Sequence, residues 1–171
     1  MSAPAGPLYT PPTQAERFHT YLQHTFWVGS ILEAGAHAGI DQARFQPSQW
    51  PEGAQGYAER FGSAFGGIVV RGTTEYALGD LFREDLRFLP CKPNCSTSKF
   101  KAALEDTFTA RKGEDGHRAF SVARLVGPLS GGLVASTWLP DGFGHRNAVR
   151  EVGLTYGLVF VRNLVRELAR R

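Results

Sequence analysis

Several features that would assign a function are scarce or missing in this sequence of 171 residues. It has 2 cysteines and 1 methionine, and no apolar run reaches the roughly 18 residues that a conventional membrane span needs. The 20 glycines follow no G-X-Y period, which excludes collagen. With 42% hydrophobic and 20% charged residues, the chain has enough apolar area to fold, which excludes a disordered protein.

The first residues lack the charged and apolar regions of a signal peptide. Prolines at positions 4, 7, 11 and 12 instead predict an extended arm over residues 1–12. Directly after the arm, Thr13 and Glu16 have the spacing of a capping box, which marks the start of a helix. We therefore expect a proline-rich arm followed by a single helical domain over residues 13–171.

Apolar residues recur at helical spacing through most of this domain. They predict five helices, over 13–43, 54–84, 98–111, 121–138 and 145–170, with a polar turn at 112–117 and no strand. The mixed charges of 80–87 are expected at a solvated helix end. The predicted fold class is all-α, a compact bundle of about five helices.

Each of the four long predicted helices carries one G-x-x-x-G motif. The eight glycines are Gly35, Gly39, Gly62, Gly66, Gly127, Gly131, Gly153 and Gly157. Residues four apart share a helix face, and a glycine inside a helix costs about 1 kcal/mol relative to alanine. Close approach between helix backbones is the usual compensation, so these faces are predicted to pack the bundle. The alternative is that some of them meet a lipid surface or a partner helix.

The two cysteines, Cys91 and Cys95, are separated by three residues that include Pro93 and Asn94. A structural zinc site needs four ligands, and a redox motif normally has two intervening residues. Because proline and asparagine favour a tight turn, we predict a local disulfide formed in an oxidising compartment. This prediction favours an exported protein.

The positive charge of the chain is concentrated near its end. Residues 146–171 contain six arginines and two glutamates. Arg162, Arg166 and Arg170 could reach an anionic membrane surface, although a solvated helix end is the simpler explanation for them. No basic stripe interleaved with aromatic residues is present elsewhere, so nucleic acid is not an expected partner.

A candidate catalytic or metal-binding set lies on the first predicted helix. Glu33, His37 and Asp41 are spaced i, i+4, i+8 and share one face. Two carboxylates and an imidazole could hold a metal ion or position the histidine as a base, whereas a solvated polar stripe accounts for them without any function. No nucleophile elbow or phosphate-binding loop is present, and the sequence predicts no cofactor.

Residues 50–65, with the run Gly56-Tyr57-x-x-Arg60-Phe61-Gly62, are similar to a segment from a family of exported, glycine-rich helical bacterial proteins whose activity is uncharacterised. The resemblance extends roughly over residues 17–165. It implies export to the periplasm or cell envelope and a glycine-rich helical fold, and it implies no catalytic residues.

We therefore expect a non-enzymatic, envelope-associated protein that acts through self-association, a protein partner or a membrane surface. The alternative is a metal-dependent or small-molecule-binding enzyme that uses the Glu33, His37 and Asp41 face.

Overall fold

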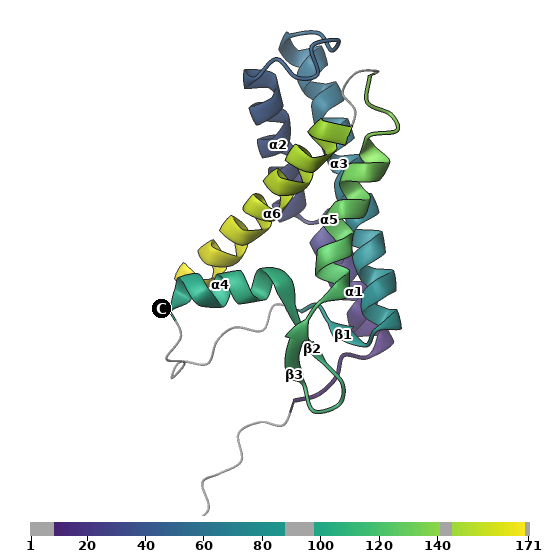
Figure 1. Cartoon of the computed structure of the whole chain (residues 1–171), viewed down its shortest axis with the longest axis vertical. Coiled ribbons are helices and arrows are strands. Elements are labelled where there is room, and N and C mark those ends of the chain that lie inside the picture. The colour runs from purple at the N-terminus through teal and green to yellow at the C-terminus, as the bar shows by residue number, and fades with distance from the viewer. Residues whose placement is uncertain (1–8, 88–97, 141–144, 170–171) are drawn as a thin grey trace, which may run out of the picture.

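The chain folds as a bundle of helices with a small antiparallel sheet at one end (Figure 1). This computed structural model describes residues 9–87, 98–140 and 145–169. Its helices are α1 (Gln14–Phe26), α2 (Val28–Ala43), α3 (Gly53–Leu81), α4 (Lys99–Phe108), α5 (Val122–Ala135) and α6 (His145–Leu168). The all-α prediction is confirmed, since the helices pack against one another and the sheet is minor.

The first predicted helix is interrupted at Trp27. The capping box is present, because the Thr13 amide donates to Glu16 Oε2 at 2.8 Å and the Glu16 amide donates to the Thr13 hydroxyl at 3.3 Å. At Trp27 the backbone is extended (φ −86°, ψ 168°), which separates α1 from α2. The Ser30 hydroxyl donates across the break to the His24 carbonyl, so polar groups of the next turn compensate the interruption.

The prediction of no strand is wrong. Strands β1 (Glu84–Asp85), β2 (Thr109–Lys112) and β3 (His117–Phe120) form an antiparallel sheet in the order β1-β2-β3. The predicted helix over 98–111 ends at Phe108 because the chain turns back at residues 113–116. Gly113 and Gly116 have φ of 69° and 64° there, a conformation that glycine adopts without steric cost.

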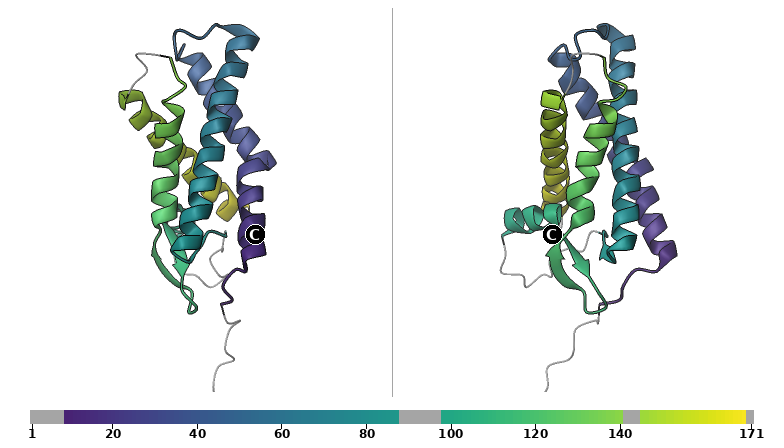
Figure 2. Two further views of the ribbon diagram at one scale, coloured as in Figure 1. Left: turned by 90° about the vertical axis from the view of Figure 1, so that its right-hand side faces the viewer. Right: turned by 45° about the vertical axis from the view of Figure 1, so that its right-hand side comes forward.

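Helix α3 is the centre of the bundle. Figure 2 shows α1 and α2 following one another along one side of α3, with α5 along another side. Helix α6 crosses the bundle and packs against α4 and α5. The interior between α2, α3, α5 and α6 is where the candidate site lies.

The glycines of α5 allow it to approach α3 closely. A Cβ at Gly131 would lie 2.7 Å from the carbonyl oxygen of Gly67, and a Cβ at Gly127 would overlap the Glu75 side chain. A Cβ at Gly35 would lie 3.3 Å from the Tyr57 hydroxyl oxygen, and a Cβ at Gly66 would lie 3.3 Å from a ring carbon of Trp138. Close helix packing therefore explains the α5 motif.

The remaining four glycines of these motifs do not lie at close helix contacts. A Cβ at any of them would meet no heavy atom within 4 Å: Gly39, Gly62, Gly153 and Gly157. The prediction that every G-x-x-x-G face packs the bundle is therefore corrected. The α6 motif in particular points away from its neighbours, because α6 packs through another face.

The residues that carry the family resemblance support the loop between α2 and α3. The Arg60 guanidinium donates to the carbonyls of Gln46 at 2.7 Å, Pro51 at 3.0 Å and Pro47 at 3.2 Å. A Cβ at Gly56 would overlap the Pro51 carbonyl, so this position has room for glycine alone. Gly56 and Arg60 therefore hold the loop against the start of α3.

Burial in this bundle departs from the usual pattern in a way that we call reversed burial. Apart from Ile68, the buried apolar side chains are all alanines, namely Ala34, Ala38, Ala102, Ala103, Ala110 and Ala123. Buried charged residues include Glu33, Arg71, Glu84 and Asp85. Large apolar side chains are exposed instead, among them Trp27 at 68% and Leu32 at 67%. Charged residues are rarely buried in globular proteins unless they are paired.

Candidate functional site

An ion pair links α2, α3 and α6 in the middle of the bundle. Both terminal nitrogens of Arg71 donate to Glu33, one of them at 3.1 Å to Oε2, and both side chains are 6% exposed. Arg162 of α6 lies 3.5 Å from the same carboxylate. Burial opposes ionisation, but the Arg71 and Arg162 guanidiniums hold the pKa of the Glu33 carboxyl below its usual range.

Glu33, His37 and Asp41 do not form the metal site that their spacing predicted. Glu33 is taken by the two arginines, and Asp41 accepts from Arg150 at 3.0 Å. Among the described residues, no group of three histidine, cysteine, aspartate or glutamate side chains is arranged to hold a metal ion. The prediction of a metal site is therefore wrong, because the Glu33 and Asp41 carboxylates form ion pairs with arginines instead.

His37 and Asp41 instead line a partly open cavity of about 70 Å³. Arg60, Arg71 and Thr155 are also in its wall, and His37 is buried. The small residues that α3 and α5 place opposite them, such as Gly67 and Gly131, leave this space open. Two of the three residues predicted to bind a metal, His37 and Asp41, thus line this cavity, whereas Glu33 does not and the arginines Arg60 and Arg71 do.

A second cavity, which we call the arginine cavity, lies where α1, α3, α4, α5 and α6 meet. It has a volume of about 40 Å³, and its charged and titratable lining residues are His24, Glu75, Asp106, Arg124, Arg162 and Arg166. Arg124 donates to the backbone carbonyls of Asp106 and, at 3.3 Å, of Leu86. The Nε of Arg162 is buried and has no hydrogen-bond partner.

The environment of the arginine cavity disfavours positive charge. Burial, together with Arg162, Arg166, Arg124 and Arg71, lowers the pKa of His24 to about 3. Burial also lowers the pKa of Arg162 to about 10. The pKa of the Glu75 carboxyl is raised, because burial outweighs the nearby arginines. The cavity wall therefore combines concentrated cationic groups with an imidazole that stays neutral.

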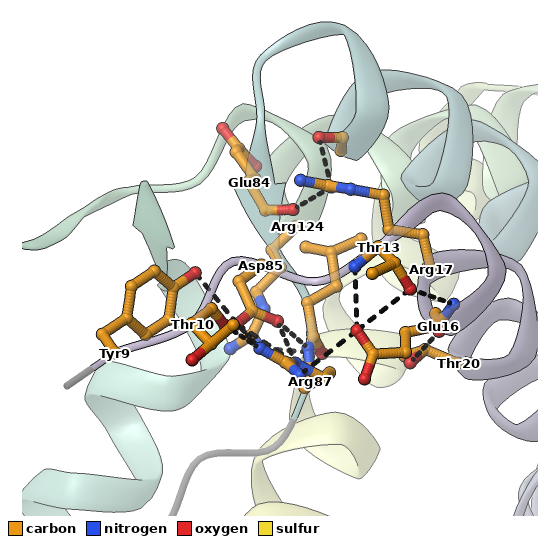
Figure 3. A network of polar contacts seen from close by, with 12 residues as sticks. Tyr9, Thr10, Thr13, Glu16, Arg17, Thr20, Glu84, Asp85, Arg87 and Arg124 are labelled. Atoms are coloured by element: carbon orange, nitrogen blue, oxygen red, sulfur yellow. Dashed lines mark hydrogen bonds and ion pairs between the residues drawn. The ribbon is translucent and has the colours of Figure 1, made fainter. Parts of the chain in front are cut away.

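A separate polar network joins the start of the chain to the sheet and to α5 (Figure 3). The Glu84 carboxylate accepts from the Ser121 hydroxyl, from the amides of Val122 at 2.9 Å and Ala123 at 3.1 Å, and from Lys112 Nζ at 2.9 Å. These contacts place a fully buried negative charge at the N-terminus of α5, where the helix dipole favours it.

Asp85 extends this network to the arm. It accepts from the Tyr9 hydroxyl at 3.1 Å and from Arg87 Nη2 at 2.8 Å, and Arg87 also donates to the Thr10 carbonyl. The expectation that residues 80–87 form a solvated helix end is wrong for Glu84 and Asp85. No local sequence signal distinguishes these two buried carboxylates from their exposed neighbours.

Helices α1 and α2, together with Trp27 between them, carry seven large apolar residues that are exposed, which we call the outer stripe. Its members are Phe18, Leu22, Phe26, Trp27, Val28, Ile31 and Leu32, exposed by 39% to 68%. Further exposed apolar side chains lie on α5 and just after it (Leu129, Leu133, Val134 and Trp138) and on α6 (Val149, Val161, Val165 and Leu168). None of the helices over the described residues combines the length and apolarity needed to cross a bilayer.

The predicted anionic-surface residues differ in their positions. Arg162 turns inward to Glu33 and so does not contribute to the outward basic patch that was predicted, whereas Arg166 lines both the arginine cavity and an open groove along α1. Helix α6 presents this face to the bundle interior, which is the reason for the difference. Arg170, Cys91 and Cys95 lie outside the described residues, and the disulfide stays a prediction.

Comparisons with protein-family models, curated proteins and solved structures find no match to this chain.

Proposed function

We propose that this chain is a non-enzymatic envelope protein that lays its apolar outer stripe against a membrane surface. The observation that carries the proposal is the reversed burial, with charged groups inside and large apolar side chains outside. Polar groups that face the interior and pair with one another, with apolar residues outward, are typical of proteins in a lipid environment. The envelope location depends on the resemblance of residues 50–65.

The outer stripe is large enough to drive such binding. Complete burial of a large apolar side chain contributes about 1.5–3 kcal/mol. The seven residues of the stripe are roughly half exposed, so their transfer into a membrane interface would contribute on the order of 5–10 kcal/mol before association costs. Because Arg162 pairs with Glu33 inside the bundle, this binding is driven mainly by apolar contact and has a weak salt dependence.

A lipid surface accounts for the distribution of exposed apolar groups better than a second copy of the chain. A symmetric dimer covers one patch on each subunit. Here exposed apolar residues lie on the outer stripe, near the end of α5 and on α6, which are different helices of the bundle. A membrane interface can contact more than one of these surfaces at the same time.

Vesicle co-sedimentation tests the proposal. Trp27→Ser and Leu32→Ser each remove a large apolar side chain that is about two thirds exposed. Each should therefore weaken binding about tenfold. Leu81→Ser, at a leucine 71% exposed outside the stripe, is the matched control and should leave binding unchanged. A different result would show that the partner of the stripe is a second copy of the chain. In that case the protein would bind neither zwitterionic nor anionic vesicles, and analytical ultracentrifugation would show dimers that Trp27→Ser dissociates.

The small-molecule-binding alternative keeps one supporting observation. His37 and Asp41 line the 70 Å³ cavity together with Arg60 and Thr155. If this cavity serves a substrate, native mass spectrometry of the purified protein should show a bound small molecule that His37→Ala removes. An identical mass for wild type and variant, apart from the substitution, counts against this alternative.

A further inference from the structure

We propose that the arginine cavity binds a small oxyanion of the phosphate class, held by Arg124, Arg162 and Arg166. This site is independent of the outer stripe and of the proposed membrane binding. It lies among α1, α3, α4, α5 and α6, and the three arginines come from α5 and α6. Guanidinium groups recognise phosphate through paired, charge-assisted hydrogen bonds.

Arg162 retains an unused hydrogen-bond donor in the interior of the bundle. Arg162 Nε is buried and lacks a partner, although buried donors are normally satisfied. Arg124 donates to two backbone carbonyls, and the nearby Asp106 and Glu75 carboxylates offset part of its charge. An oxyanion in the cavity would supply the acceptor that Arg162 Nε lacks.

The two carboxylates in the cavity wall already have arginine partners outside it. Asp106 accepts from Arg118, and Glu75 lies 4.0 Å from Arg71 Nε. Neither Arg118 nor Arg71 is among the residues that line this cavity. Burial is the main cause of the low pKa of His24, and the nearby arginines lower it further, which agrees with a positive potential inside the cavity. The lining therefore has an excess of positive charge.

The size of the cavity restricts the ligand. Its volume of about 40 Å³ has room for about three water molecules, which suits a single inorganic oxyanion and excludes a nucleotide. His24 and Arg166 also line an open groove along α1, together with Glu16 and Trp27. This shared wall places the arginine cavity next to a groove that is open to solvent.

Calorimetric titration of the full chain with inorganic phosphate tests the proposal. Saturable binding with one site per chain is expected, with competition by sulfate and none by chloride at equal ionic strength. Glycerol 3-phosphate distinguishes free phosphate from an esterified headgroup, because the small cavity predicts at least tenfold weaker binding of the ester. Equal or tighter binding of the ester would overturn the assignment to a free ion.

Two arginine variants locate the site. Arg166→Gln should weaken phosphate binding at least tenfold, whereas Arg44→Gln, which removes the same charge from an exposed position, should change it less than twofold. Equal weakening by both variants would overturn the proposal, because it would indicate general electrostatic attraction. Absence of saturable phosphate binding to the wild-type chain would overturn it as well, whatever the folding of the variants.

Discussion

One methyl group, added at Gly131 or at Gly62, tests whether glycine allows α5 to pack on α3. A Cβ at Gly131 would lie 2.7 Å from the Gly67 carbonyl oxygen and 3.3 Å from the Arg71 Cβ. Neither atom can rotate away as the end of a flexible side chain can, so the two helices must separate. At Gly62, in the interior of α3, the same methyl group meets nothing within 4 Å. Gly62→Ala is therefore the matched control for Gly131→Ala.

The two variants should change the free energy of unfolding differently relative to wild type. Both variants gain about 1 kcal/mol from the higher helix propensity of alanine. Gly131→Ala also causes overpacking, which typically costs about 1–3 kcal/mol. We therefore expect Gly62→Ala to be about 1 kcal/mol more stable than wild type, and Gly131→Ala to lie between unchanged and about 2 kcal/mol less stable.

Thermal unfolding followed by far-UV circular dichroism measures the difference. At about 2–4 °C per kcal/mol for a chain of this length, the Tm of Gly62→Ala should exceed that of Gly131→Ala by roughly 2–12 °C. Equal increases in Tm for the two variants would refute the reasoning, because they would show that α5 accommodates a Cβ without losing its contact with α3.

Two further predictions concern the buried charges. Glu33→Gln should lower the free energy of unfolding by about 3–5 kcal/mol in denaturant titrations, because it leaves Arg71 and Arg162 without their carboxylate. The exposed control Glu52→Gln should lower it by less than about 0.5 kcal/mol. Similar losses in the two variants would contradict the role of the buried ion pair. The pKa of His24 is about 3 in the folded chain and about 6.5 when unfolded, so the unfolded state binds the proton first as pH falls. Stability should therefore decrease from pH 6.5 to 5, by at most about 1.4 kcal/mol per pH unit, and His24→Gln should flatten this slope; an unchanged slope would show that other groups cause it.

Helix periodicity predicted most of the fold but missed the features that tertiary contacts decide. The capping box at Thr13 and Glu16 is a local signal, and it correctly marked the start of α1. The break at Trp27 has no proline or helix-ending signal, and the strand β2 (Thr109–Lys112) has no alternation of apolar and polar residues. β2 forms because Gly113 and Gly116 turn the chain back on itself and β1 pairs with it.

The candidate site was less predictable, because periodicity shows that a helix has two faces but not which face is inward. The spacing of Phe18, Leu22 and Phe26 is typical of a core-facing helix, yet these side chains are 39% to 48% exposed. Glu33 and Arg71 are charged residues, for which the sequence alone predicts exposure to solvent. In the structure they form an ion pair in the interior. Their pairing joins positions 38 residues apart in the sequence, and no local pattern contains that information.

The reversed burial and the proposed membrane role have a common physical basis. Small buried side chains such as Ala34 and Ala103 remove little apolar area from water, so the hydrophobic effect contributes less to this fold than to an ordinary bundle. The helices are held instead by directional contacts, of which Glu33 with Arg71 and Glu84 with the start of α5 are the most buried. The large apolar side chains remain available outside, where a lipid surface can bury them. Since a partner that binds the folded state alone stabilises it, membrane binding would supply stability that the interior of this bundle does not.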